Sequence, residues 1–159
     1  MLWLDPGEVD YFPLSYTAFW IQNSLFGRAT TGYHVTNMLL HVANGLLLWN
    51  LLARIKIPGS WFAALAFTIH PACVESVAWI SELKNTLSLL PFLACCIFWV
   101  MQDAAGEGPR QKWLYAASLF FFLLSMLAKP TAVAMPVVTL LYRSEEHTSE
   151  LQSRQYLVC

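Results

Sequence analysis

The chain has 159 residues, of which 57% are hydrophobic and 14% aromatic, while only 12% are charged. A soluble domain averages about 25% charged and about 45–50% apolar residues, so this composition indicates a membrane protein. The formal net charge of −1 and the lack of a basic cluster argue against nucleic-acid binding. The four cysteines form no CxxC pair and have no metal-ligand spacing with histidine. We interpret them as small hydrophobic residues.

Residues 1–32 precede the first long apolar run. Three acidic residues, Asp5, Glu8 and Asp10, occupy the positions where a signal peptide would be positively charged, so no signal peptide is predicted. Residues 14–26 are rich in Tyr, Phe and Trp but are interrupted by polar side chains. Because Tyr and Trp favour the membrane–water interface, we expect a helix along the outer membrane surface here.

The rest of the chain is dominated by apolar runs of helical length. A helix needs about 20 residues to cross the ~30 Å hydrocarbon core. Residues 33–55 supply one such run, residues 86–101 and 113–128 are two further apolar runs that we interpret as spans, and residues 131–142 begin another. Residues 60–69 would reach only about 15 Å, and cross only if the following segment continues them. The sequence therefore predicts an all-α fold, a polytopic transmembrane helix bundle over residues 33–142.

The loop charges predict how these runs are oriented. Four cationic residues fall on one side of the membrane: Arg54, Lys56, Arg110 and Lys112. The other side has Arg28, Lys84 and Lys129, so the positive-inside rule favours the first side as cytoplasmic. The polar interruptions of the apolar sequence would then all lie on the opposite, periplasmic or lumenal face.

The first long run contains four polar residues on one helical face: His34, Asn37, His41 and Asn44. At i, i+3, i+7 and i+10 they lie within about 80° of one another. Such a stripe should not face lipid, so it either forms interhelical hydrogen bonds or lines a wet cavity. His34 and His41 would be about 10 Å apart along the helix axis, which argues against a shared metal ion.

The segment IHPACVESVAWISELKN concentrates ionisable residues between two apolar runs. Glu75 and Glu82 would share a face if the segment were one helix, and either carboxylate is a candidate base or metal ligand. Lys84, Lys129 and His70 are candidate contacts for a lipid phosphate. The alternative interpretation is that these charges only keep an interfacial loop in water.

The last 17 residues, RSEEHTSELQSRQYLVC, differ in composition from everything before them. They resemble the translation of a sequencing-library adapter, and we expect residues 143–159 to be a cloning artefact without a functional role.

Four stretches taken in order resemble one known family: YFPLSYTAFW, LFG followed by GYHVTNMLLHVANGLLL, ALAFTIHPACVESVAWISELKNTLS, and LAKPTAVAMPVVTLL. They are similar to the membrane portion of bacterial multi-span proteins with C-terminal tetratricopeptide repeats. Those proteins are related to the eukaryotic transmembrane-and-tetratricopeptide-repeat O-mannosyltransferases of the GT-C glycosyltransferase superfamily. The resemblance covers nearly all of residues 9–142.

The resemblance implies a GT-C helix bundle whose active site faces the exoplasmic side, in a bacterial inner membrane with a periplasmic active face. The donor would be a polyprenyl- or dolichyl-phosphate sugar, with or without a divalent metal, and the acceptor a protein or glycan. The catalytic acid of such enzymes usually lies in the first external loop. Residues 1–32 would be the remnant of that loop, and Asp10, directly before YFPLSY, is the best candidate.

Two departures from the family pattern bear on activity. Leu83 stands where an arginine commonly precedes the lysine, and no repeats follow Tyr142. The chain is therefore expected to be a fragment that is inactive by itself. A transporter or flippase, and a membrane anchor of a repeat scaffold, are the alternative functions.

Overall fold

A computed structural model of the chain describes residues 12–130 and 133. The described residues form no strand, and their bounded elements are α-helices and a 3-10 turn: α1 Pro13–Phe26, α2 Thr30–Arg54, α3 Ser60–Ile69, α4 Pro71–Ala78, η1 Ile80–Glu82, α5 Leu83–Asp103 and α6 Pro109–Ala128. The predicted all-α class is confirmed. Asp10, nearly all of the predicted last span and residues 143–159 lie outside the described residues.

In the described part of the chain, three segments are long and apolar enough to cross a membrane: α2, the combined η1 and α5 (Ile80–Asp103), and α6. They coincide with the three predicted spans, which supports the prediction of a polytopic bundle. α6 starts earlier than predicted because Pro109 occupies its first position, where the fixed φ of proline favours a helix start. α5 also starts earlier, at Leu83, and the polar residues Asn85 and Thr86 of its first turn find partners on neighbouring elements.

The short run forms α3, and a bend of 52° joins it to α4. His70 caps α4, since its Nδ1 accepts the backbone N–H of Ala72 at 3.1 Å, and Pro71 starts the helix. Together α3 and α4 are apolar enough for a broken span or a re-entrant loop. The backbone is extended at Trp79, so a single helix through residues 69–85 does not form. The expectation that Glu75 and Glu82 share one helical face is therefore corrected.

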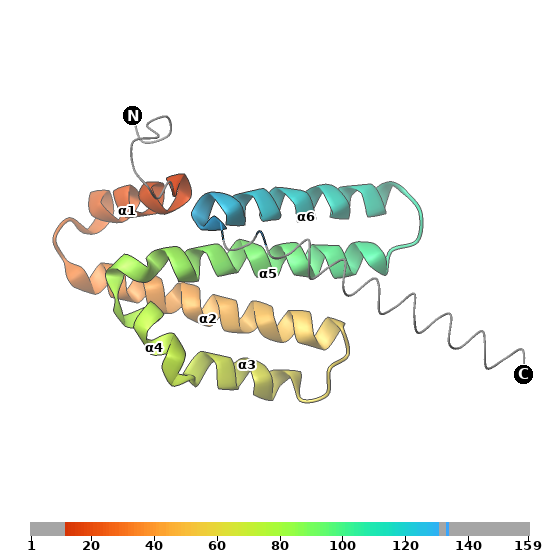
Figure 1. Ribbon diagram of the computed structural model, residues 1–159, viewed down its shortest axis with the longest axis horizontal. Coiled ribbons are helices and arrows are strands. Elements are labelled where there is room, and N and C mark those ends of the chain that lie inside the picture. The colour runs from red at the N-terminus through yellow and green to blue at the C-terminus, as the bar shows by residue number, and fades with distance from the viewer. Residues whose placement is uncertain (1–11, 131–132, 134–159) are drawn as a thin grey trace, which may run out of the picture.

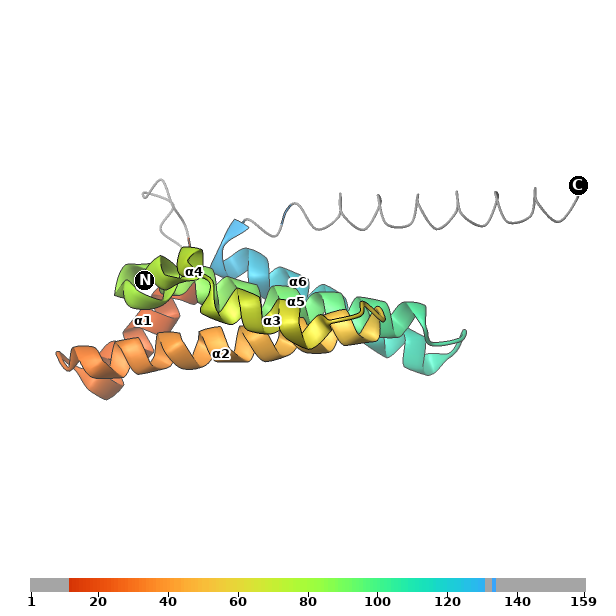
Figure 2. The same cartoon turned by 90° about the horizontal axis from the view of Figure 1, so that it is seen from below.

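Figure 1 shows α6, α5, α2 and α3 as successive rows with their long axes in one direction, and Figure 2 shows the same alignment from the side. α1 packs against the end of α6 and also contacts α2 and α5. The loops at residues 55–59 and 104–108 lie at one end of the bundle, here called the loop end. The end of α6, the start of α5 and α4 lie toward the other end, here called the site end. Arg54, Lys56, Arg110 and Lys112 thus all belong to the loop end, in agreement with the prediction that they share one side.

The burial pattern is that of a membrane protein. Large apolar side chains such as Leu39 (65% exposed) and Phe120 (59%) point outward, whereas Asn37, Asn44 and Ser125 are almost fully buried. In a bilayer, apolar side chains are stable when they face lipid, whereas polar groups need hydrogen-bond partners inside the bundle. Hydrogen bonds and close packing therefore hold these helices together.

Gly45 allows α2 and α3 to approach closely. A Cβ at this position would lie 2.4 Å from Thr68 Oγ1, which already donates to the carbonyl of Ala64 at 2.8 Å. Gly45→Ala should therefore destabilise the fold by about 1–3 kcal/mol, the usual cost of overpacking. The measurement is the thermal unfolding midpoint in detergent micelles. Gly106→Ala is the matched control, because a Cβ there meets nothing within 4 Å. Equal midpoints for both variants would contradict this account.

Candidate functional site

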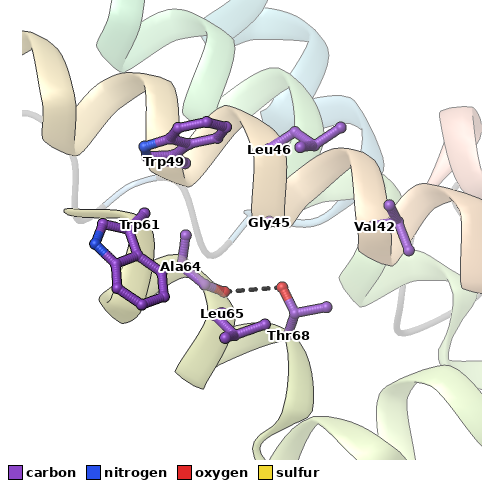
Figure 3. Close-up of a pocket in the computed structure, with 8 residues that line it drawn as sticks. All are labelled: Val42, Gly45, Leu46, Trp49, Trp61, Ala64, Leu65 and Thr68. Carbon is purple, nitrogen blue, oxygen red and sulfur yellow. Dashed lines mark hydrogen bonds between the residues drawn. The ribbon is translucent and has the colours of Figure 1, made fainter. Parts of the chain in front are cut away.

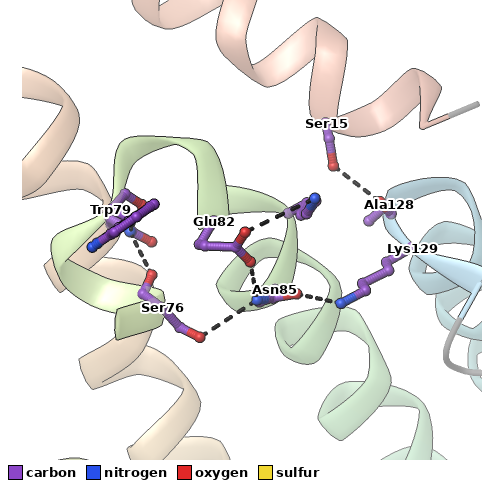
Figure 4. Close-up of polar contacts among 9 residues, drawn as sticks. Ser15, Ser76, Trp79, Glu82, Asn85, Ala128 and Lys129 are labelled. Atoms are coloured by element: carbon purple, nitrogen blue, oxygen red, sulfur yellow. Dashed lines mark hydrogen bonds and ion pairs between the residues drawn. The ribbon is translucent and has the colours of Figure 1, made fainter. Parts of the chain in front are cut away.

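A chain of polar side chains joins four elements at the site end (Figure 4). The Lys129 ammonium donates to Asn85 Oδ1 at 2.5 Å. The amide nitrogen of Asn85 donates to a Glu82 carboxylate oxygen and, at 3.4 Å, to the Ser76 hydroxyl. The Asn85 amide is thereby oriented, with its oxygen toward a cation and its nitrogen toward a carboxylate. Ser76, Glu82, Asn85 and Lys129, together with Lys84, are called the polar cluster below.

Lys84 extends the polar cluster toward α1. Its Nζ lies 4.0 Å from the second carboxylate oxygen of Glu82, and 5.9 Å from the centroid of the Phe12 ring. The side chains of Lys84 and Glu82 are 32% and 26% exposed, so the pair is only partly shielded from solvent. The cluster contains two ammonium groups and one carboxylate, which leaves an excess of positive charge. Such a site attracts an anion with several acceptor oxygens, such as a phosphate.

The end of α6 is held in place by α1, and this positions Lys129. Ser15 on α1 donates to the carbonyl of Ala128 at 2.9 Å, and both residues are buried. The helix ends there because residues before a proline are pushed out of helical geometry, and Lys129 precedes Pro130 with an extended backbone. The lysine side chain can therefore leave the helix and reach Asn85 on α5.

Three of the four residues in the predicted polar stripe form hydrogen bonds to neighbouring elements. Asn37 donates to the carbonyls of Ser76 at 2.7 Å and Val77 at 3.0 Å, and it accepts from the Thr86 hydroxyl. The carbonyl of the same Thr86 accepts from Asn44 at 2.8 Å.

His41 Nε2 donates to the carbonyl of Thr68 at 3.0 Å, whereas His34 is exposed. Interhelical hydrogen bonding thus accounts for Asn37, Asn44 and His41. These bonds fix the path of the chain from α4 into α5 and so support the residues of the cluster.

The structure separates the other predicted site residues. Glu75 is exposed on α4, and His70 is exposed with its Nδ1 engaged in capping. Glu82 lies within the cluster, but both of its carboxylate oxygens face a partner, which does not favour it as a free base. Among the described residues, no group of three or more His, Cys, Asp or Glu side chains is placed to hold a metal ion.

Sequence reasoning missed Asn85, the residue that links both sides of the cluster. The available signal was an asparagine directly after Lys84 at the start of an apolar run, where a membrane helix rarely places an amide without a partner. Ser76 was noted in the sequence as a hydroxyl of the polar segment, whereas Ser15 carried no comparable signal because isolated serines are common in membrane helices.

The chain is 27% identical to the protein O-mannosyl-transferase Tmtc3 of Drosophila melanogaster in an alignment 158 positions long, which covers 83% of this chain and 17% of the relative. It is 31% identical to the mouse protein O-mannosyl-transferase TMTC1 in an alignment 143 positions long, which covers 83% of this chain and 15% of the relative. A protein O-mannosyl-transferase of Caenorhabditis elegans, F38B6.6, is 30% identical in an alignment 95 positions long, which covers 57% of this chain and 14% of the relative. No protein-family model and no solved structure matches the chain.

The matched part is a small fraction of each relative, about a sixth of its length. The relatives named above are animal proteins, and they give no support to the expected bacterial inner membrane. Three apolar helices fit an integral membrane protein of either origin. The comparisons confirm the resemblance drawn from the motifs: in sequence, this chain is similar to the protein O-mannosyl-transferases of the TMTC family.

Proposed function

We propose that this chain is the part of a GT-C membrane glycosyltransferase that holds the phosphate of a lipid-linked sugar donor. The full protein would transfer a mannosyl group from a polyprenyl or dolichyl phosphate to a protein hydroxyl on the exoplasmic face. The observation that carries this proposal is the polar cluster, in which Lys129 and Lys84 converge on Asn85 and Glu82 at one end of the bundle. The relatives, which are named as protein O-mannosyl-transferases, support the reaction class.

The cluster suits the charge that such a reaction develops. The acceptor oxygen forms a bond to the anomeric carbon while the bond from that carbon to the phosphate oxygen breaks, so negative charge grows on the lipid phosphate. Preorganised cations stabilise such charge far more effectively in a partly dry site than in water. Lys129 and Lys84 supply those cations in this proposal.

Glu82 has a different proposed role. Because its oxygens face Asn85 and Lys84, it orients both and balances their charge until the phosphate arrives. The acceptor proton then needs another base, for which Asp10 is our candidate. Asp10 precedes Phe12 by two residues, and the Phe12 ring lies 5.9 Å from Lys84 Nζ.

A photoactivatable polyprenyl phosphate provides the test. With the full chain in phosphatidylcholine vesicles, we expect saturable crosslinking to peptides from the start of α5 and the end of α6. Lys129→Gln should weaken labelling by about tenfold, because a hydrogen bond to a charged group contributes about 1.5–3 kcal/mol. The readout is labelling against probe concentration, followed by peptide mapping.

Two further variants make the result specific. Lys112→Gln is the control, because it removes the same charge at the loop end and should leave labelling unchanged. Glu82→Gln should strengthen labelling, because it removes the carboxylate that competes with the phosphate for Lys84. If a photoactivatable polyprenol without phosphate labels the same peptides as strongly as the polyprenyl phosphate does, the proposal is contradicted. Movement of the probe across the vesicle membrane would instead favour the flippase alternative.

A further inference from the structure

An apolar groove of about 380 Å³ lies between α2 and α3, away from the polar cluster (Figure 3). Trp49 and Trp61 border one end of it, and Val42 and Thr68 border the other. The Thr68 hydroxyl is engaged, because it donates to the carbonyl of Ala64 at 2.8 Å. The groove therefore offers an almost wholly apolar surface and no specific polar contact along its length.

The length of the groove suits a hydrocarbon chain. From Val42 to Trp49 it follows seven residue steps of α2, or about 10 Å at ~1.5 Å per residue. An extended acyl chain can lie along an apolar groove of this length and volume.

The charges near the Trp-bordered end fit an anionic headgroup. Trp49 is followed by Arg54, the last residue of α2, and by Lys56 in the loop that joins α2 to α3. No Asp or Glu occurs in the sequence between Asp10 and Glu75, so the α2–α3 loop itself carries no acidic residue. The acidic residues of the loop end, Asp103 and Glu107, belong to the end of α5 and the loop that follows it. Trp49 (48% exposed) and Trp61 (61%) are also placed as interfacial tryptophans are, at the level of lipid headgroups.

We propose that this groove binds one acyl chain of an anionic phospholipid whose headgroup lies against Arg54 and Lys56. The bound lipid would be distinct from a sugar donor at the polar cluster. α3 packs against α2 and α4, and in Figure 1 both α2 and α5 lie between α3 and α6, which precedes Lys129. The cations of the lipid site are at the loop end, so the lipid belongs to the leaflet opposite the cluster. Its function is to fill the seam between α2 and α3 and to hold α3 in the membrane.

Fluorescence quenching in vesicles tests this proposal. The full chain, with its five other tryptophans replaced by phenylalanine, is placed in phosphatidylcholine vesicles so that emission comes from Trp49 and Trp61. Phosphatidylglycerol brominated on its acyl chains is then added in increasing mole fraction. We expect quenching to saturate at a lower mole fraction than with brominated phosphatidylcholine. Arg54→Gln and Lys56→Gln should each raise the half-quenching mole fraction by about fivefold.

The matched control removes two cations at the loop end but outside the groove. Arg110→Gln with Lys112→Gln should leave the half-quenching mole fraction unchanged. Quenching that follows the bulk mole fraction equally for both lipids would overturn the proposal, as would an equal effect of the control pair. Loss of quenching as the protein-to-lipid ratio rises would show that a second copy of the chain covers the groove, and would overturn it too.

Discussion

Replacing Lys129 with alanine in the longer protein expected to contain this chain should lower the rate of mannosyl transfer by about 10²–10³, the usual loss when one preorganised charge stabiliser is removed. The physical reason is the position of its ammonium group. It is held at 2.5 Å from Asn85 Oδ1, on a backbone that Ser15 and Pro130 hold at the end of α6. The effect should fall on kcat more than on KM, because the charge on the phosphate is greater in the transition state than in the bound donor.

The measurement is transfer from a lipid-linked mannose to an acceptor peptide in membranes, normalised to the amount of protein inserted. Lys112→Ala is the control, since it removes the same side chain at the loop end. Asn85→Ala should reduce transfer by a smaller factor, because the cation remains but is no longer oriented. The double variant Asn85→Ala with Lys129→Ala should be about as slow as Lys129→Ala alone, as expected for coupled residues. Unchanged transfer in Lys129→Ala would remove this lysine from the site.

The spans were predictable because they depend on local properties. Length and apolar composition located α2, α5 and α6, and the sequence bounds of the short run coincide with α3. His70 and Pro71 marked the end of that run for a local reason as well, since proline fixes φ and cannot donate to the preceding turn. Such features need no knowledge of what lies across the bundle.

The cluster was only partly predictable because it depends on contacts across the bundle. Lys84, Lys129 and Glu82 were recognised as charges in apolar surroundings, but the sequence does not specify that one amide, Asn85, bridges them across 44 positions of the chain. Similarly, periodicity placed four polar residues on one face of α2. It did not show that neighbouring elements cover Asn37 while His34, one turn earlier, remains exposed. Helical spacing predicts in which direction a side chain points, but whether that side chain is buried depends on how other elements pack against it.

The burial of Asn37 leads to the second large expected effect. Asn37→Ala should destabilise the fold by about 2–4 kcal/mol, because it leaves the carbonyls of Ser76 and Val77 without their donor. Each unsatisfied buried group costs about 1–3 kcal/mol, partly offset by relaxation. The Thr86 hydroxyl keeps a partner, since it also donates to the carbonyl of Leu83 at 3.1 Å. Thermal unfolding in detergent micelles measures the loss.

His34→Ala is the control for that prediction, since it alters the same stripe at an exposed position and should change stability little. Amide hydrogen exchange then tests whether Asn37 supports the polar cluster. Because Asn37 holds the chain between α4 and α5, its loss should loosen the segment that carries Ser76 and Glu82, and amide hydrogen exchange should rise there first. If exchange rises uniformly over the chain, or if both variants unfold at the same temperature, Asn37 does not support the cluster, and the buried stripe is then a general packing feature of α2.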